Sequence, residues 1–308
     1  MTRTIGLLTS AATAALLLMT TPPARAADLE DPGCVLSGSV MTGIMLNWQE
    51  LDFNGEDQVD VDWTTPFGEG AGLVTCGGFN IQADIAYYGH SGDYDFEFGD
   101  QDNVDRTTSH IGGVLFYRNP VSWAGGVQAS WISQNISGID VDVFRIGLFG
   151  EVYLGETFTL GGNISYHNGD SGSDFETDQA GFEFAAYGRL YATPDLSLML
   201  RADVLLADTE FFGDDGDLNG YAISGEAEYL VWDQGLSLFA GARYAERDHD
   251  LDFGNEFHFD SDDMQVFGGL KFYFGKDGTL VERHRTGPVD NTSVFEEKLP
   301  NTLFDFPS

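Results

Sequence analysis

The stretch MQVFGGLKFYF, from Met264 to Phe274, is the last strand-like run of the chain before the composition changes. Gln265 and Lys271 fall on one parity of this run. Apolar side chains occupy the other parity, namely Met264, Val266, Leu270, Phe272 and Phe274. Successive side chains of a strand point to opposite faces, so the alternation predicts a strand with one apolar and one polar face. If this strand closes a sheet, the sequence before it should consist of further strands.

The first 26 residues have the features of an export signal. Arg3 precedes an apolar run of about 15 residues, from Ile5 to Met19, and Ala24-Arg25-Ala26 forms a small-x-small cleavage pattern. A spanning helix needs ~20 apolar residues, so the run predicts a cleaved signal peptide over residues 1–26 rather than a membrane helix. The mature protein is expected to begin near Ala27.

The composition favours an all-β protein with a strongly acidic surface. The chain has 39 glycines, 24 phenylalanines, 12 tyrosines and only nine prolines. All 50 acids follow the export signal and two of the 14 bases lie within it, so the mature net charge is 12 minus 50, or −38. This charge excludes nucleic acid as a natural partner. It also requires that the acids lie where water and cations reach them.

Alternating runs, with the last stretch counted among them, predict about 12 strands, with 10 as the lower bound. The second run is the weakest, because it depends on Val59, Val61 and Trp63 alternating with polar residues. The predicted strands are 35–48, 58–65, 73–88, 106–117, 121–132, 143–154, 157–167, 179–191, 195–207, 219–231, 235–246 and 264–274.

The connections between these runs alternate in length. Tight turns are expected at 118–120, 155–156, 192–194 and 232–234, whereas the other connections are longer and acidic. Short periplasmic turns and long extracellular loops are typical of an antiparallel up-and-down transmembrane β-barrel. With an even number of strands, both ends of the barrel fall on the periplasmic side.

Charged side chains keep to one face of the predicted strands. A charge on the lipid face at mid-depth costs ~2–4 kcal/mol, so this segregation favours a barrel with a charged interior. His110 and His167 share the charged face. The expected pore-lining residues are Asp84, Arg106, Arg145, Glu151, Glu183, Arg189, Arg201, Asp203, Glu226, Glu228, Arg243 and Lys271.

Aromatic residues cluster at the ends of the strands, where two interfacial girdles would lie. A soluble β-sandwich, the alternative, would concentrate them in mid-strand. The expected periplasmic girdle is Trp63, Tyr117, Trp123, Tyr153, Tyr191, Tyr229 and Trp232, and the outer girdle is Trp48, Tyr87, Trp131, Tyr166, Tyr221 and Tyr244.

These features together resemble porin-like outer-membrane β-barrel proteins of Gram-negative bacteria. The resemblance rests on the export signal, the run Gly78–Asp84, the GGLKFYFG ending and the sequence Glu282-Arg283-His284-Arg285. It implies location in the bacterial outer membrane, contact with its lipids and lipopolysaccharide, and recognition by the barrel assembly machinery. Gly269, Phe272 and Phe274 resemble the closing-strand assembly signal of such barrels. The resemblance does not name a substrate or an oligomeric state.

The sequence therefore predicts a barrel over residues 27–275 that acts as a passive channel for small hydrophilic solutes and ions. Its acidic outer loops should favour cations. The lumen charges are also consistent with a locked polar core, because paired charges satisfy one another. The alternative is thus a closed structural or surface-interaction barrel whose acidic loops bind divalent cations, lipopolysaccharide or a host surface. No cofactor is expected, and no dedicated metal site.

An enzyme is not expected. The near candidates for a lipid-hydrolysing site are His167 beside Asn168 and Ser109 beside His110. Both histidines share the parity of the predicted lumen, whereas such a site must face the lipid at the outer rim.

Two features remain open at this stage. Cys34 and Cys76 are expected at the periplasmic rim, where a disulfide is chemically permitted. The predicted second strand would separate them by roughly 10 Å, which exceeds the normal disulfide span. Residues 276–308 are expected to form a mobile periplasmic tail, with a plug in the lumen or a docking segment as alternatives.

Overall fold

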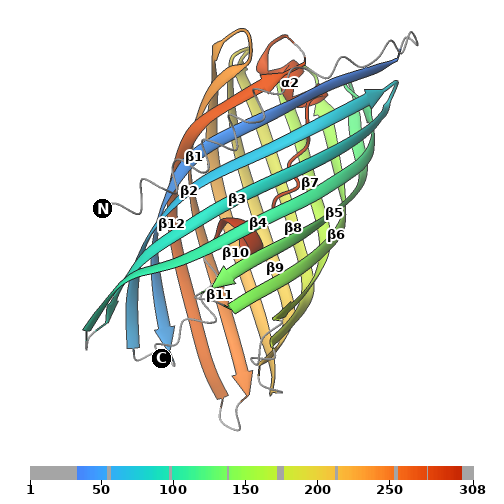
Figure 1. Cartoon of the computed structure of the whole chain (residues 1–308). Helices are drawn as coiled ribbons and strands as arrows, with labels where there is room; N and C mark the ends of the chain where they lie inside the picture. Colours follow the sequence, from blue (N-terminus) through green and yellow to red (C-terminus); the bar gives the residue numbers. More distant parts are fainter. Residues whose placement is uncertain are drawn as a thin grey trace.

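Twelve antiparallel strands form one closed barrel in the computed structural model, which describes residues 33–53, 57–96, 99–136, 139–171, 177–211, 214–252, 256–275 and 277–299 (Figure 1). The predicted signal peptide lies outside these residues. The strands are β1 (Cys34–Phe53), β2 (Asp57–Cys76), β3 (Phe79–Phe96), β4 (Gly99–Asn119), β5 (Trp123–Ile136), β6 (Ile139–Leu154), β7 (Phe158–Ser171), β8 (Thr177–Thr193), β9 (Leu196–Phe211), β10 (Asp214–Trp232), β11 (Leu236–Asp252) and β12 (Glu256–Phe274).

Each strand pairs with its sequence neighbours, and β12 closes the barrel on β1. The closing register places Gly38 opposite Phe274 and Gly43 opposite Gly269. This arrangement confirms the predicted all-β barrel and the closing role of the stretch Met264–Phe274. No helix among the described residues is long and apolar enough to cross a membrane.

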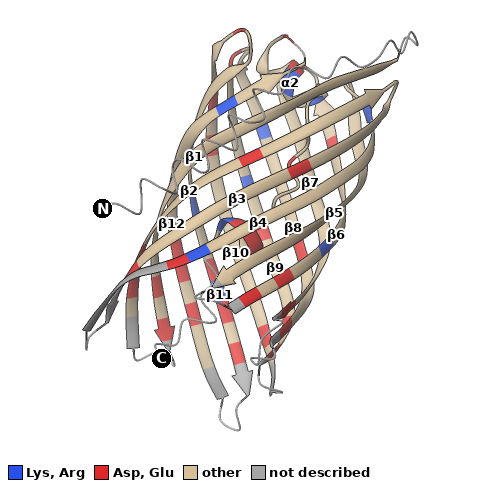
Figure 2. Cartoon of the chain, in the orientation of Figure 1, with Lys and Arg blue, Asp and Glu red and all other residues tan. Residues whose placement is uncertain are grey.

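The barrel wall is apolar outside and polar inside along its central part. Outward side chains such as Ile81, Leu148 and Leu200 are exposed, whereas inward Gln82, Arg145 and Arg201 are buried. Charged side chains on the strands face the interior in this band. Outside it, Asp and Glu residues gather toward one end of the barrel (Figure 2). The predicted alternation of polar and apolar residues thus separates the inner face of the wall from its outer face.

The second hairpin differs from its prediction. β2 continues to Cys76, and the tight turn that precedes β3 falls at Gly77-Gly78, where Gly77 has a φ of +63°. Residues 73–76, expected at the start of the third strand, therefore belong to the second. Cys76 then lies directly opposite Cys34, with 4.2 Å between their Cα atoms, and the two form a disulfide. The expected obstacle to this bridge disappears because no strand separates the two cysteines.

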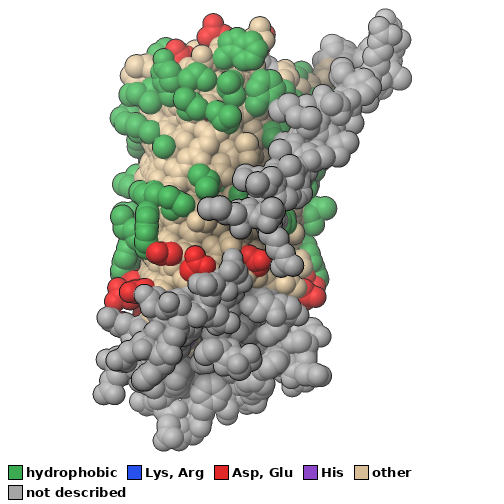
Figure 3. Space-filling view, turned by 60° about the vertical axis from the view of Figure 1, so that its left-hand side comes forward, with side chains coloured by type: hydrophobic (Ala, Val, Ile, Leu, Met, Phe, Trp, Pro, Cys, Tyr) green, Lys and Arg blue, Asp and Glu red, His purple; other side chains and the backbone are tan. Residues whose placement is uncertain are grey.

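The wall reverses its polarity at the outer end. On β2, Val59, Val61 and Trp63 are buried inside, whereas Asp60 and Asp62 are exposed outside. We call the outward acids at this level the acidic belt, visible as a band below the apolar surface in Figure 3. Among the described side chains it takes at least one exposed acid from every strand except β5: Glu50, Asp60, Asp62, Asp93, Asp105, Asp140, Asp170, Asp178, Asp208, Glu210, Asp217, Asp250 and Asp262.

Much of the sequence expected in long outer loops is therefore strand, because the backbone ladder continues past the apolar band. Two girdles of exposed aromatic residues are present in part, with Trp123 and Trp232 at one end and Trp48 and Trp131 toward the other. Three predicted girdle residues are wrong: Trp63, Tyr153 and Tyr191 are buried in the interior. Parity alone, rather than position near a strand end, decides the face of each ring.

The C-terminal segment, residues 277–299, lies inside the barrel. It contains the helix α2 (Leu280–Thr286), an extended stretch and the single π-helical turn η1 (Val294–Lys298). Its residues bond to inward side chains of β3, β6 and β12. The prediction of a periplasmic tail is therefore wrong for these residues. They lie in the lumen because they satisfy polar groups that the wall leaves unpaired. The lumen plug was the alternative that the sequence left open.

Candidate functional site in the barrel interior

The twelve side chains predicted to line a pore all face the interior. Eight are buried: Asp84, Arg106, Arg145, Glu183, Arg201, Asp203, Glu228 and Arg243. Glu151, Arg189, Glu226 and Lys271 are partly exposed. The structure therefore brings these residues into one interior, and it adds a partner that sequence reasoning did not assign to them, the C-terminal segment.

The helix α2 covers the periplasmic mouth. Arg283 donates from Nη2 to the carbonyl oxygen of Asp233 at 2.6 Å, and Arg285 donates to those of Gly155 and Phe158 at 2.6 and 2.9 Å. The helix starts at a capping box in which Thr279 and Glu282 bond to each other's backbone N–H groups. These contacts tie α2 to turns from separate hairpins, so the helix spans the mouth.

His284 holds the lumen-facing side of α2. Its ring contacts Glu228 at 3.1 Å and the hydroxyl of Tyr273 at 2.8 Å. Nη1 of Arg189 lies 2.8 Å from a ring nitrogen, and since a guanidinium only donates, that nitrogen must accept. Burial, followed by the positive charge of Arg189, lowers the pKa of His284 to about 3. The imidazole is therefore neutral at pH 7.

The extended stretch between α2 and η1 is held in the lumen by the wall, which bonds to both the backbone and the side chains of the stretch. Gln82 bonds reciprocally with the backbone N–H and carbonyl of Val289, each at 2.8 Å. Arg201 pairs with Asp290 at 2.9 Å. Burial opposes the ionisation of Asp290, but Lys298 and then Arg201 hold its pKa well below its usual range. The stretch thus adds a carboxylate to the charged interior.

A buried histidine joins the segment to the wall farther in. Nε2 of His110 lies 2.7 Å from Asp84, and Nδ1 lies 3.0 Å from Glu297 of η1. Asn291 also donates to Asp84, at 3.0 Å. Ionised carboxylates only accept hydrogen bonds, so a charged imidazolium satisfies both contacts. This chain of contacts links β3, β4 and the C-terminal segment.

An apolar contact holds the far end of the segment. Phe295 and Leu299 are 4% and 1% exposed, and they pack with Val294 inside the outer half of the barrel. Their partners come from β9, β10 and β11: Leu205, Ala207, Leu218, Ala222 and Ala245. We call this group the apolar latch. Smaller apolar contacts also dock the segment, with Val289 packed among Leu73, Val114 and Phe116, and Leu280 among Tyr191, Leu230 and Tyr273.

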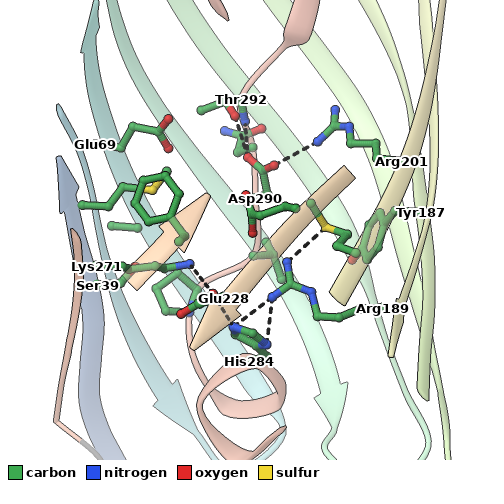
Figure 4. A pocket seen from close by; sticks show the side chains of 18 of the residues that line it. Ser39, Glu69, Tyr187, Arg189, Arg201, Glu228, Lys271, His284, Asp290 and Thr292 are labelled. Carbon is green, nitrogen blue, oxygen red and sulfur yellow. Dashed lines mark hydrogen bonds and ion pairs between the residues drawn. The ribbon is translucent and has the colours of Figure 1, made fainter. Parts of the chain in front are cut away.

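A cavity of about 180 Å³ remains beside the segment, and we call it the chamber (Figure 4). Asp290 and Thr292 border it from the segment, whereas Glu69, Arg189 and Glu228 reach it from the wall. Its lining carries six Lys or Arg (Arg189, Arg201, Arg243, Lys271, Arg285 and Lys298) and six Asp or Glu (Glu69, Asp84, Glu151, Glu226, Glu228 and Asp290). The chamber is therefore polar and formally neutral.

The candidate catalytic residues are not brought together. Ser109 faces outward, whereas His110 faces inward and is held between two carboxylates. His167 is buried in the lumen near Glu296 and Gln179. Across the described ranges, no three His, Cys, Asp or Glu side chains are placed to hold a metal ion.

Sequence reasoning missed the residues of the C-terminal segment that meet the wall. Two signals were present in the sequence. The pattern Thr279-x-x-Glu282 is a capping box, which predicts a helix start, and Arg283 and Arg285 bracket His284 two residues apart. What the sequence does not contain is the position of their wall acceptors, which are carbonyl groups at the β6–β7 and β10–β11 turns.

Comparison with known proteins places the fold among outer-membrane barrels. No family model and no curated protein matches the chain. The COG4313 outer membrane channel from Pseudomonas putida F1 is similar over 80% of this chain and 98% of its own, with 12% identity and a TM-score of 0.55. The β domain of the Bordetella autotransporter BrkA covers 77% of this chain and 100% of its own, with 10% identity and a TM-score of 0.49. The chain has a closed twelve-stranded β-barrel fold, similar to that of the COG4313 outer membrane channel.

Proposed function

We propose that this protein is a passive diffusion channel for small hydrophilic solutes and ions, with a preference for cations. The observation that carries the proposal is the charged interior with its chamber, inside a closed barrel whose wall is apolar outside. Polar groups buried within a membrane protein mark a path for polar solutes, because they have no role toward lipid.

The preference for cations follows from the acidic belt. Its carboxylates surround the outer end of the barrel, where a negative potential concentrates cations and repels anions. The chamber is formally neutral, so we expect the selectivity to arise outside it. Because exposed charges are screened over about 8–10 Å at physiological salt, the preference should weaken as salt rises.

The test is single-channel recording of the refolded protein in a planar bilayer under a salt gradient. Discrete steps with a reversal potential that favours cations would support the proposal. The double variant Asp60→Asn and Asp62→Asn removes two exposed acids from β2 and should shift the reversal potential toward zero at low salt. A shift of equal size at 1 M salt would contradict an origin in exposed charge.

A second candidate is a closed barrel with a structural or surface-interaction role. The observation in its favour is the C-terminal segment, which occupies the lumen from α2 to the apolar latch. In that case the acidic belt binds divalent cations, lipopolysaccharide or a host surface. A folded, heat-modifiable protein that never conducts, either intact or without residues 277–308, would favour this function over the channel. We propose no enzymatic activity in either case.

A further inference from the structure

One side of the chamber is lined by aromatic and methionine side chains, which a passage for ions does not require. The rings of Phe67 and Phe239 lie 6.2 Å apart between centroids, and Tyr88 stacks on Phe67 at 5.9 Å. Met45 and Phe267 belong to the same group. We call these residues the aromatic wall. They come from β1, β2, β3, β11 and β12, so only closure of the barrel unites them.

Glycines let these rings lie flat against the strands. Phe67 is paired with Gly43, and a Cβ at Gly43 would come within 2.7 Å of its ring. Phe239 is paired with Gly269, where a Cβ would meet the Phe239 ring at 2.9 Å. Gly43 and Gly269 are themselves paired across β1 and β12. The rings therefore lean over bare backbone and leave the space of the chamber open.

Charges of both signs border the aromatic wall, and Lys298 lies near Glu69, Glu226 and Asp290 without a direct ion pair to any of them. Among the described residues, no carboxylate lies within 4.0 Å of the cationic groups of Arg243 or Lys298. Arg243 is 6% exposed, its Nε has no hydrogen-bond partner, and its guanidinium lies 5.4 Å from the ring centroid of Phe267. Glu226 has no hydrogen bond or ion pair within the same part of the chain, and Glu69 accepts only from Tyr88.

These groups surround one apolar surface at adjacent levels of the wall. Glu226 pairs with Gly241, which pairs with Phe267, so the carboxyl group and the ring belong to one row of inward positions. Arg243 lies two residues along β11 from Gly241, on the same face. An anion alone would give no direct ion pair to Glu226 or Glu69, and a cation alone would give none to Arg243 or Lys298.

We propose that the chamber binds a small zwitterion with an apolar side chain, of which an apolar amino acid is the simplest example. Its ammonium group binds Glu226 or Glu69, its carboxylate binds Arg243 or Lys298, and its side chain packs on the aromatic wall. The inference deepens the proposed function, since the channel supplies the route by which such a solute reaches the chamber. The site itself is independent of whether passage is completed.

The test is equilibrium dialysis of the refolded full chain in detergent against L-phenylalanine. 2-Phenylethylamine and phenylacetate each lack one of the two charges, and glycine lacks the apolar side chain. We expect phenylalanine to bind at least about tenfold more tightly than each of the three, since a hydrogen bond to a charged group contributes a factor of this order. Equal binding of either singly charged analogue would overturn the assignment of a zwitterion.

Variants assign the two charges. Glu226→Gln should weaken binding of phenylalanine about tenfold and remove its advantage over phenylacetate. Glu226 has no hydrogen bond or ion pair to another described side chain, so this variant is expected to fold. Heat modifiability checks that it does. Asp60→Asn in the acidic belt is the matched control and should leave binding unchanged. Unchanged binding in Glu226→Gln, or an equal loss in Asp60→Asn, would place binding outside the chamber and overturn the site.

Conductance is measured separately on the same preparations. Binding of phenylalanine by a protein that does not conduct would support the chamber while removing the channel. Conductance without binding of phenylalanine would leave the channel and overturn the zwitterion site.

Discussion

The barrel wall and the C-terminal segment occupy the same interior but are specified in different ways. The wall depends on a period of two that repeats through twelve strands, and its backbone ladder is complete from β1 to β12. The segment has no such period, and it is held by individual contacts such as Arg285 to Gly155, His110 to Glu297 and Phe295 in the apolar latch. The alternation of polar and apolar residues, repeated along every strand, specifies the wall. A few individual contacts specify the position of the segment.

Of the two regions, the C-terminal segment is the one that can change its position. A wall strand cannot leave without exposing a row of unpaired backbone groups in the membrane. The segment makes no strand pairs, so its release would cost its side-chain contacts and expose polar groups only to lumen water. The segment is therefore the part whose removal tests the comparison most directly.

Deletion of residues 277–308 is expected to give the largest effect. The barrel should still fold and remain heat-modifiable, because all twelve strands of the described barrel end before residue 275. Conductance should rise several-fold, since the lumen of twelve strands would then be free of the segment. Single-channel recording measures the change.

The matched control for this deletion removes residues 300–308 alone, which leaves the contacts of residues 277–299 in place. Unchanged conductance in the longer deletion, with a folded barrel, would show that the segment does not restrict the path.

Substitution Phe295→Ala tests the contribution of the apolar latch. A buried phenylalanine cut to alanine loses about 3–5 kcal/mol of packing, so docking of the segment should weaken by up to this amount. The expected result is more frequent openings to the conductance of the deletion variant. Phe295→Leu keeps most of the apolar volume and should show few of them. Equal opening in both variants would mean that the latch is not what retains the segment.

Substitution Leu200→Arg tests the wall. Leu200 is 61% exposed on the outward face of β9, so a charge there should destabilise the barrel by about 2–4 kcal/mol. Asp208 is also exposed on the outward face of β9, but it lies in the acidic belt, and Asp208→Arg should cost far less. Urea unfolding in lipid vesicles measures both. Similar losses of unfolding free energy at the two positions would mean that the membrane boundary does not lie between Leu200 and Asp208.

Acidification should loosen α2 through His284, with a smaller effect. The pKa of the docked imidazole is lowered to about 3 by burial and by Arg189, whereas a free histidine titrates near 6.5. The undocked state therefore binds more protons between these values, so docking is favoured above pH 6.5 and is progressively lost as pH falls toward 3.

The measurement for this effect is opening frequency at pH 7 and pH 5. It should rise at pH 5 in the wild-type protein and change less in His284→Gln, which keeps a polar side chain without the titration. Glu228, which contacts His284, should be kept in both proteins. The same pH response in the variant would assign the effect to carboxylates rather than to His284.

The wall could be predicted from the sequence because the inward or outward direction of a side chain depends on residues close to it in the chain. Met264 to Phe274 shows its parity within eleven residues, and every predicted pore-lining charge lies on the interior face. Trp63 was misplaced for the same reason. An aromatic residue near a strand end is typical of a girdle, but in β2 the polarity of the faces reverses beyond the apolar band.

The disulfide and the site could not be predicted from local patterns. Cys34 meets Cys76 only because β2 continues past its expected end to the turn at Gly77. The chamber combines Phe67, Phe239 and Lys298, which lie far apart in the sequence. No periodicity relates such residues, so only the register of the closed barrel and the path of the segment bring them together.

Local patterns in the sequence were enough to predict a barrel, the lipid face of its central band and the charges that lie inside. These properties follow from a period of two and from the cost of placing charge in lipid. Only the structure shows that Cys34 bonds to Cys76 and that residues 277–299 lie inside the lumen. Each of these depends on contacts between distant residues, whose free energy is realised only once the barrel has closed.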